Sequence, residues 1–144
     1  MTASEEHVRR HRDMIDAFNH LDFDRMVESY SEDATATDHA QQMTRHGPDR
    51  TREANEAWVE AFPDAMIEVL DCFGIGDWTV MRFVGRGTNF DRFAGFGPTN
   101  ERAEIEFCQL LRWEDDRIME DHLYYDLYGM LSQLGHVPEM ATAT

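Results

Sequence analysis

Apolar and polar residues alternate between residues 104 and 113, and this alternation is the clearest pattern in the chain. A period of two is typical of a β-strand with one covered face. The covered face would carry Ile105, Phe107, Gln109, Leu111 and Trp113. Gln109 is the one polar residue among them, so we expect it either to bond to a buried partner or to face a cavity.

A second extended run, 118–125, follows an acidic turn and is expected to pair with this strand as an antiparallel hairpin. If Gln109 lies opposite Leu123, Asp121 points to the covered side and His122 to the other side. The covered face of the second strand would then hold Met119, Asp121, Leu123 and Tyr125. A shift of one residue would exchange Asp121 and His122, because successive strand residues face opposite sides.

Helical spacing of apolar residues marks the first third of the chain. A first helix is expected at about 4–19, with a stripe formed by Val8, His11, Ile15 and Phe18. A second helix begins after Asp22, a typical N-cap residue, and ends near Ser31. The next segment is expected to contain a turn at 32–33, a short extended piece at 34–39 and a loop at 41–47. A third helix begins at Pro48 and ends near Phe62.

Strand patterns fill most of the remaining chain, at 66–73, 78–90, 101–113 and 117–125. Gly85 and Gly87 can bend the second of these strands. Asp126 then caps a short helix that ends at Gly135. The predicted fold class is α+β, with a curved, mainly antiparallel sheet wrapped by three N-terminal helices and closed by a short C-terminal helix. Such a sheet leaves a cavity between itself and the helices.

The length of 144 residues fits one domain, with a core at 4–135 and a tail at 136–144 that is expected to fray. No apolar run is long enough to span a membrane, and the first residues do not resemble a signal peptide, so we expect a cytoplasmic protein. Cys72 and Cys108 lie in predicted strands and are expected to be reduced, buried thiols.

The charge balance is strongly acidic. Against 29 Asp and Glu residues stand 13 basic residues, all of them arginine, which gives a net charge of −16. We therefore expect no nucleic-acid partner, because phosphate binding needs a basic surface. The acid excess also suggests adaptation to high salt, where screening relieves the repulsion between acids.

The seven histidines show no spacing that is typical of a metal site. His7 and His11 lie one helical turn apart, on what we expect to be a solvated face. The chain has no Gly-rich phosphate loop and no nucleophile elbow. We therefore expect neither a metal nor a cofactor.

Several short segments carry a resemblance that spans 8–135. They are 31–38 (SEDATATD), 61–64 (AFPD), 76–80 (GDWTV), 85–89 (GRGTN), 93–100 (FAGFGPTN), 118–120 (IME) and 126–135. In this order and spacing the chain resembles the SnoaL-like polyketide cyclases, within the wider cone-shaped α+β superfamily that includes ketosteroid isomerase and nuclear transport factor 2. The resemblance implies the cone-shaped fold and says less about activity, because members of the superfamily catalyse different reactions or none.

The resemblance also assigns positions to roles. It places Asp38 where ketosteroid isomerases have a catalytic carboxylate. It places Gln109 where those enzymes have an oxyanion-stabilising acid and where the cyclases have a histidine. Three positions depart from the pattern: Leu123 stands in place of the cyclase aspartate, Met14 in place of the isomerase tyrosine, and Asn89 in place of a histidine found in relatives.

Four polar residues are candidates for the chemistry. Asp38 could remove a proton next to a carbonyl, or it could simply form a turn in a loop. Asp121 is the best replacement for the missing acid at 123, and His122 takes that role if the register slips. Gln109 could donate a hydrogen bond to an enolate oxygen, or it could be a buried amide bonded to a neighbouring tyrosine.

Asn89 has the same two interpretations, as a substrate ligand or as a buried amide. Six apolar or aromatic residues could form cavity walls for a flat hydrophobic ligand, or could simply be core: Trp58, Phe62, Phe83, Phe107, Leu123 and Tyr125. We expect a cofactor-free enzyme that performs acid/base (enolate-type) chemistry, such as cyclisation or isomerisation, on a small hydrophobic carbonyl compound. The alternative, which Leu123 favours, is a non-catalytic domain that binds a hydrophobic ligand or a partner.

The outer face of the predicted sheet also carries apolar residues. Val84, Cys108 and Leu110 alternate onto this face. Exposed apolar residues on a sheet are a liability unless a partner covers them. Because the resemblance implies pairing through the same face, we expect a homodimer.

Overall fold

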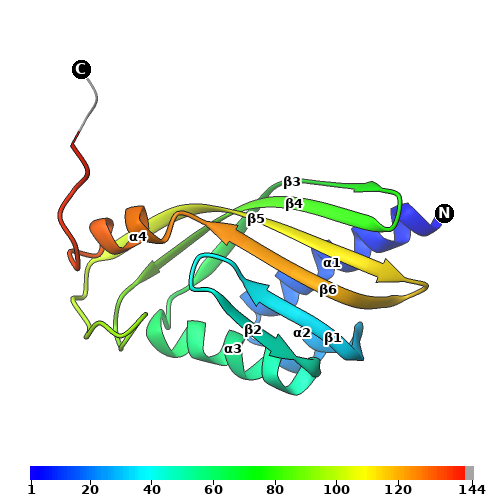
Figure 1. Cartoon of the computed structure of the whole chain (residues 1–144), viewed down its shortest axis with the longest axis horizontal. Coiled ribbons are helices and arrows are strands. Elements are labelled where there is room, and N and C mark those ends of the chain that lie inside the picture. Colours follow the sequence, from blue (N-terminus) through cyan, green and yellow to red (C-terminus); the bar gives the residue numbers. More distant parts are fainter. Residues whose placement is uncertain (142–144) are drawn as a thin grey trace.

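The computed structural model of the chain describes residues 1–141. These residues form helices and strands in the following order (Figure 1): α1 (Ala3–Asn19), α2 (Phe23–Val27), β1 (Tyr30–Asp38), β2 (Met43–His46), α3 (Gly47–Ala61), β3 (Met66–Ile75), β4 (Trp78–Thr88), β5 (Arg102–Glu114), β6 (Arg117–Tyr125) and α4 (Leu127–Gln133). The fold is α+β, as predicted.

The strands form one six-stranded sheet in the order β2-β1-β6-β5-β4-β3. Only the β1–β6 pair in this sheet is parallel; the other neighbours are antiparallel. The prediction that β4, β5 and β6 are antiparallel neighbours is therefore confirmed. The sheet is curved and open, not closed into a barrel (Figure 1).

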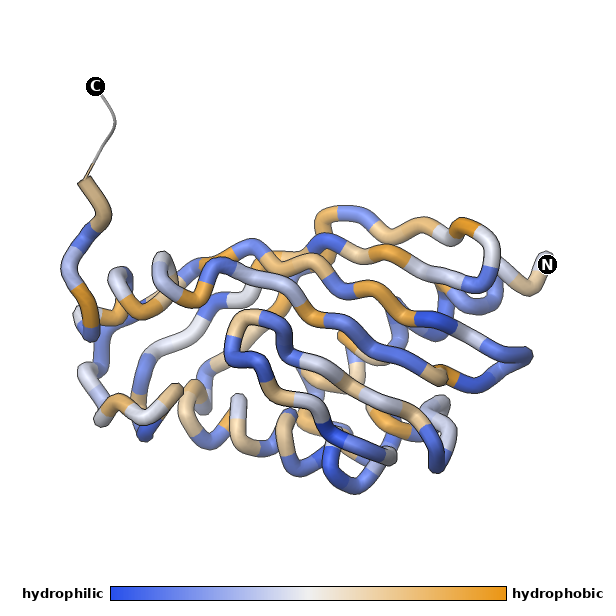
Figure 2. Tube along the Cα trace, in the orientation of Figure 1, coloured by the Kyte–Doolittle hydropathy of each residue, from blue (hydrophilic) through white to orange (hydrophobic). Residues whose placement is uncertain are grey.

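The register of the central hairpin is the predicted one. Gln109 of β5 pairs with Leu123 of β6. Asp121 is consequently buried on the inner face, while His122 is only partly buried. Along β5, buried residues alternate with more exposed ones from Ala103 to Trp113. Figure 2 shows the same mixing of hydrophobic and hydrophilic positions along the strands.

One part of the hairpin departs from the predicted alternation. The pairing shifts between Arg112 and Trp113, so that Arg112 pairs with Glu120 and Trp113 with Ile118. Ile118 is fully buried, and Met119 is only partly buried. The expectation that Met119 lies on the inner face is therefore wrong, because an extra residue in one strand reverses the alternation beyond it.

The segment between the second and third helices is more regular than predicted. Helix α2 is capped by the side chain of Asp22, as expected, but it ends at Val27. Residues 32–33 belong to β1, and 43–46 form β2. The predicted turn and loop are wrong because these strands are stabilised by pairing with distant β6 and with each other, which local periodicity does not reveal.

Helices cover the inner face of the sheet. Helix α1 packs on β3 and β4, α3 packs on β1 and β2, and α2 lies between α1 and α3 (Figure 1). Helix α4 packs on β5 and contributes Met130 and Leu131 to the core. Among the described residues, no helix combines the length and the apolar character that a membrane span requires.

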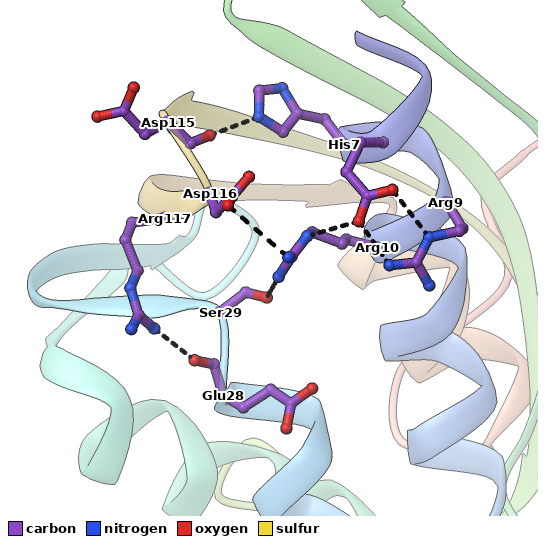
Figure 3. A network of polar contacts seen from close by, with 9 residues as sticks. His7, Arg9, Arg10, Glu28, Ser29, Asp115, Asp116 and Arg117 are labelled. Carbon is purple, nitrogen blue, oxygen red and sulfur yellow. Dashed lines mark hydrogen bonds and ion pairs between the residues drawn. The ribbon is translucent and has the colours of Figure 1, made fainter. Parts of the chain in front are cut away.

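The start of α1 is tied to the far end of the hairpin by the polar contacts in Figure 3. His7 stacks on Trp113, and its Nε2 atom lies 2.5 Å from the carbonyl oxygen of Asp115. Arg10 donates to the hydroxyl of Ser29 and lies 3.9 Å from the carboxylate of Asp116. The expectation that His7 and His11 occupy a solvated face is wrong, since both are buried.

The beginning of the C-terminal tail is held against the domain. His136 donates through Nε2 to the side-chain oxygen of Asn89 at 2.7 Å and stacks on Phe96, and Val137 packs against the core. Tyr128 donates to the carbonyl oxygen of Pro138. Residues 136–138 thus contact the domain, while residues 142–144 of the tail that was expected to fray lie outside the described part.

Candidate active site

A cavity with two lobes lies between the sheet and helices α1, α2 and α3. The lobes share the lining residues Met26, Asn55, Trp58, Gln109 and Leu123. The apolar lobe is further lined by residues that include Phe18, Phe62, Phe83 and Phe107. The polar lobe is further lined by residues that include Tyr30, Thr37, Asp38, Arg45 and Asp121. The cavity therefore suits a ligand that is hydrophobic at one end and polar at the other.

Most of the predicted wall residues line the apolar lobe. Trp58, Phe62, Phe83, Phe107 and Leu123 do so. Tyr125 is not a lining residue of either lobe. Its ring packs against Phe107 and Trp58, and its hydroxyl group bonds to Asp38.

A buried chain of hydrogen bonds leads to the cavity between α1 and the inner face of the sheet. The indole N–H of Trp113 lies 3.0 Å from the hydroxyl oxygen of Thr79. That oxygen lies 2.8 Å from Nδ1 of His11, whose Nε2 lies 2.9 Å from the side-chain oxygen of Gln109. Because an amide oxygen can only accept, His11 donates through Nε2 and accepts from Thr79 at Nδ1.

This chain orients the amide of Gln109. With its oxygen bound to His11, Gln109 turns its NH2 group toward Asp121 and donates to Oδ1 at 3.0 Å. An amide has two N–H donors, and Asp121 uses one of them. Gln109 lines both lobes, and no hydrogen bond within residues 1–141 uses its second N–H.

Asp121 is the most buried carboxyl group in contact with the cavity. It accepts hydrogen bonds from Gln109 and from the hydroxyl of Tyr30, the latter at 2.6 Å. Burial raises the pKa of Asp121 above its usual range, while these two hydrogen bonds act in the opposite direction. A carboxyl group with a raised pKa at a cavity wall suits proton transfer near neutral pH.

Two further groups of the site have pKa values shifted by burial. Burial lowers the pKa of His11 to about 4, and its bond to Gln109 opposes this change. His11 is therefore neutral at pH 7, as its hydrogen-bond pattern requires. Burial raises the pKa of Tyr30 well above its ordinary value, and the neighbouring Asp121 adds to the rise. Tyr30 therefore stays a donor to Asp121.

Asp38 lies at the end of β1 and lines the polar lobe. Its carboxylate accepts from the hydroxyl of Tyr125 at 2.8 Å, from the backbone N–H of Gln41 at 2.9 Å, and from the side chain of Gln41 at 3.3 Å. Burial raises the pKa of Tyr125, so this tyrosine remains protonated as a donor. Asp38 and Asp121 thus share one lobe, with different surroundings.

Two predicted site residues lie elsewhere. Asn89 lines neither lobe, and its amide bonds to His136 and to the carbonyl oxygen of Asp91. His122 is on the other face of β6, where it bonds to His39 at 2.8 Å and to Glu120 at 3.0 Å. The structure therefore brings together Asp38, Asp121 and Gln109, without Asn89 or His122.

Sequence reasoning missed His11, Thr79 and Tyr30 as parts of the site. The signal for His11 was present, because it shares a helical stripe with Ile15 and Phe18. A polar residue on an apolar stripe needs a buried partner, the same argument that singled out Gln109. Within residues 1–141, no group of three or more His, Cys, Asp or Glu side chains could hold a metal ion.

The family model of the SnoaL-like polyketide cyclases matches residues 8–134. The chain belongs to the SnoaL-like polyketide cyclase family. A comparison with curated proteins finds no match.

Solved structures share the SnoaL-like fold. A candidate SnoaL-like polyketide cyclase from Jannaschia sp. CCS1 superposes with a TM-score of 0.87 at 17% identity, covering 96% of this chain and 97% of that one. IdmH, a candidate polyketide cyclase from Streptomyces antibioticus, has a TM-score of 0.75 at 27% identity, covering 88% and 96%. AclR, a candidate hydroxylase from Streptomyces galilaeus, has a TM-score of 0.82 at 22% identity, covering 96% and 90%. Proteins that share this fold are thus described as enzymes of more than one reaction class.

Proposed function

We propose that this SnoaL-like protein is a cofactor-free enzyme that moves a proton on a small hydrophobic carbonyl compound, in a cyclisation or an isomerisation. The observation that carries the proposal is the pair formed by Asp121 and Gln109. A buried carboxyl group with a raised pKa lies 3.0 Å from an amide whose second N–H forms no hydrogen bond within residues 1–141. The proposed base, Asp121, is thus adjacent to the proposed oxyanion donor, Gln109.

In the proposed step, the Asp121 carboxylate takes a proton from the carbon next to the carbonyl group. The electron pair of the broken C–H bond moves onto the carbonyl oxygen, which becomes an enolate oxygen and accepts from Gln109. The protonated Asp121 then returns the proton, either to another carbon in an isomerisation or to the alkoxide formed when the enolate carbon attacks a second carbonyl. Neither path needs an oxidant or a reductant.

Asp121 suits the role of base better than Asp38 does. Its burial raises the pKa, which favours proton uptake from carbon. The Asp38 carboxylate accepts three hydrogen bonds and that of Asp121 accepts two, so Asp38 has fewer free lone pairs for a substrate proton. Asp38 is the second candidate for the base.

A binding protein without catalysis is the alternative function. Leu123 lines both lobes at the position where the family resemblance expects an acid. It makes the cavity more apolar than that pattern implies. In this alternative, Asp121, Gln109 and His11 form a buried polar network that fixes the fold.

The test is exchange of the α-protons of aromatic methyl ketones in heavy water, followed by proton NMR with a panel of neutral and anionic ketones. We expect the wild type to accelerate exchange of at least one ketone, and Gln109→Leu to reduce the rate by about 10-fold to 10³-fold. Binding of ketones in the cavity without any acceleration of exchange across the panel would contradict the proposal and support the binding protein.

A further inference from the structure

The polar lobe contains a cation that has no carboxylate partner. Arg45, on the short strand β2, lines this lobe and is partly buried. The one hydrogen bond of its side chain is a long contact of 3.9 Å to the sulfur of Met43. Arg45 forms no ion pair within 4.0 Å with any residue from 1 to 141.

Arg12, Arg92, Arg102 and Arg117 also form no ion pair within residues 1–141, but Arg45 is the arginine that lines the polar lobe. On the outer face of the sheet, Arg82, Arg86 and Arg112 each contact two carboxylates. Although acids outnumber arginines by more than two to one, neither Asp38 nor Asp121 lies within 4.0 Å of the Arg45 side chain in an ion pair, so its guanidinium group is available to a ligand. A guanidinium group binds carboxylates with paired N–H donors.

The hydrogen bonds of the residues near Arg45 in the lobe are compatible with a bound anion. Asn55 of α3 donates one amide N–H to the carbonyl oxygen of Thr51 at 2.9 Å, which leaves its second N–H available. Asp38 and Asp121 are the acids of this lobe that would repel an anion, but both already accept hydrogen bonds on their carboxylate oxygens, Asp38 from Tyr125 and Gln41 and Asp121 from Tyr30 and Gln109. Arg45 and Asn55 therefore supply the donors that a carboxylate needs.

We propose that the compound bound by this cavity is an anion, in which a carboxylate is held by Arg45 and Asn55 and an apolar ring system fills the apolar lobe. The inference rests on the proposed function only for the site of the reaction, because recognition of the carboxylate does not require chemistry. It makes Arg45 a specificity-determining residue. The substrate class becomes a hydrophobic carbonyl compound that carries a carboxylate.

The experiment compares two probes of nearly equal size, 2-naphthoate and its neutral methyl ester. Their affinities are measured by quenching of tryptophan fluorescence, since Trp58 lines both lobes. We expect the wild type to bind the carboxylate about tenfold more tightly than the ester, because a charge-assisted hydrogen bond contributes a difference of that size. Arg45→Gln should bind the two probes equally.

Arg50→Gln is the matched control, because it removes the same charge from an exposed arginine of α3 that pairs with Glu53. It should keep the preference for 2-naphthoate. Equal affinity of the wild type for both probes, absence of 2-naphthoate binding, or an unchanged preference in Arg45→Gln would each overturn the inference. Circular dichroism of the variants excludes unfolding as the cause of lost binding.

The same probes separate this inference from the proposed function. An Asp121→Asn variant should lose proton exchange and still prefer 2-naphthoate over the ester. If the preference depends on Arg45 while no ketone undergoes exchange, the function is wrong and the anion site stands. If exchange proceeds equally with Arg45→Gln on anionic ketones, and both probes bind equally, the anion site is wrong and the function stands.

Discussion

At the scale of single residues, Gln109 is central to the site because it lines both the apolar and the polar lobe of the cavity. Its oxygen accepts from the neutral His11 and its NH2 group donates to Asp121, so its orientation depends on the protonation of a buried histidine. The sequence was sufficient to single out Gln109 and Asp121, because each is polar at a position expected to face inward. The sequence was not sufficient for His11. A histidine on a helix can either form hydrogen bonds in the core or face solvent, and only the packing of the helix on the sheet determines which of the two occurs.

The pH dependence of stability should report the buried His11. In the folded protein the pKa of His11 is about 4, against 6.5 for the ordinary group. The unfolded chain therefore binds this proton at a higher pH than the folded one, and stability is lost as pH falls from 6.5 toward 4. The loss from this group is about 3 kcal/mol, an upper figure for a shift of this size.

Urea unfolding between pH 7 and pH 4 measures this effect in the wild type and in His11→Gln. The Gln side chain can still donate to Gln109 but does not titrate, so its stability should fall less steeply with decreasing pH. His20→Gln, at an exposed histidine, should follow the wild type. Parallel curves for the wild type and His11→Gln would show that His11 does not titrate as described.

Strand register and close packing determine the cavity at the scale of elements. The alternation in 104–113 predicted β5 and the hairpin with β6, because both strands bury one face along most of their length. β1 and β2 were partly missed, because a parallel partner comes from a distant segment and because β2 is largely exposed. The extended segment expected at 34–39 does correspond to the end of β1, which carries Asp38.

The end of α3 approaches β4 closely enough to require a glycine at 87. A Cβ atom on Gly87 would lie 3.0 Å from the Cβ atom of Phe62, a wall residue of the apolar lobe. Gly87→Ala should therefore destabilise the protein by about 1–3 kcal/mol, measured by urea unfolding. Gly97→Ala is the control, since nothing lies within 4 Å of its added Cβ atom. Equal stability of both variants would refute the close approach.

At the scale of the whole molecule, the main features are the negative net charge and the outer face of the sheet. The net charge is −16, and the arginine pairs on the outer face neutralise only part of the acids. The same face exposes apolar side chains, among them Phe73 and Tyr124. Both cysteines are free and half-buried, and burial raises the pKa of Cys72 to about 11.

Stability should rise with salt, because counterions screen repulsion among the excess acids. We expect the melting temperature to rise by about 4 °C or more between 0.1 M and 2 M KCl, which corresponds to roughly 1 kcal/mol or more. Differential scanning calorimetry measures it. KCl is preferred to sulfate, because sulfate strengthens apolar burial in most proteins. A flat melting temperature would contradict adaptation to high salt.

We propose that the protein forms a homodimer through the outer face of the sheet, where Phe73 is 52% exposed and Tyr124 is 43% exposed. Light scattering at micromolar concentration and physiological salt should give twice the mass of one chain. Phe73→Asp should give the mass of one chain. Phe90→Asp, at an exposed residue after β4, should leave the dimer intact. A wild type of single-chain mass would contradict this assembly.

The proton-transfer role of Asp121 is tested most directly by comparing the rates of two variants on one substrate. Once a ketone that undergoes exchange is known, kcat/KM is measured for Asp121→Asn and Asp38→Asn, which keep the side-chain shapes and remove one proton acceptor each. We predict a fall of about 10² or more for Asp121→Asn, and a smaller fall for Asp38→Asn. Full activity of Asp121→Asn together with loss of activity in Asp38→Asn would contradict the account and assign the base to β1.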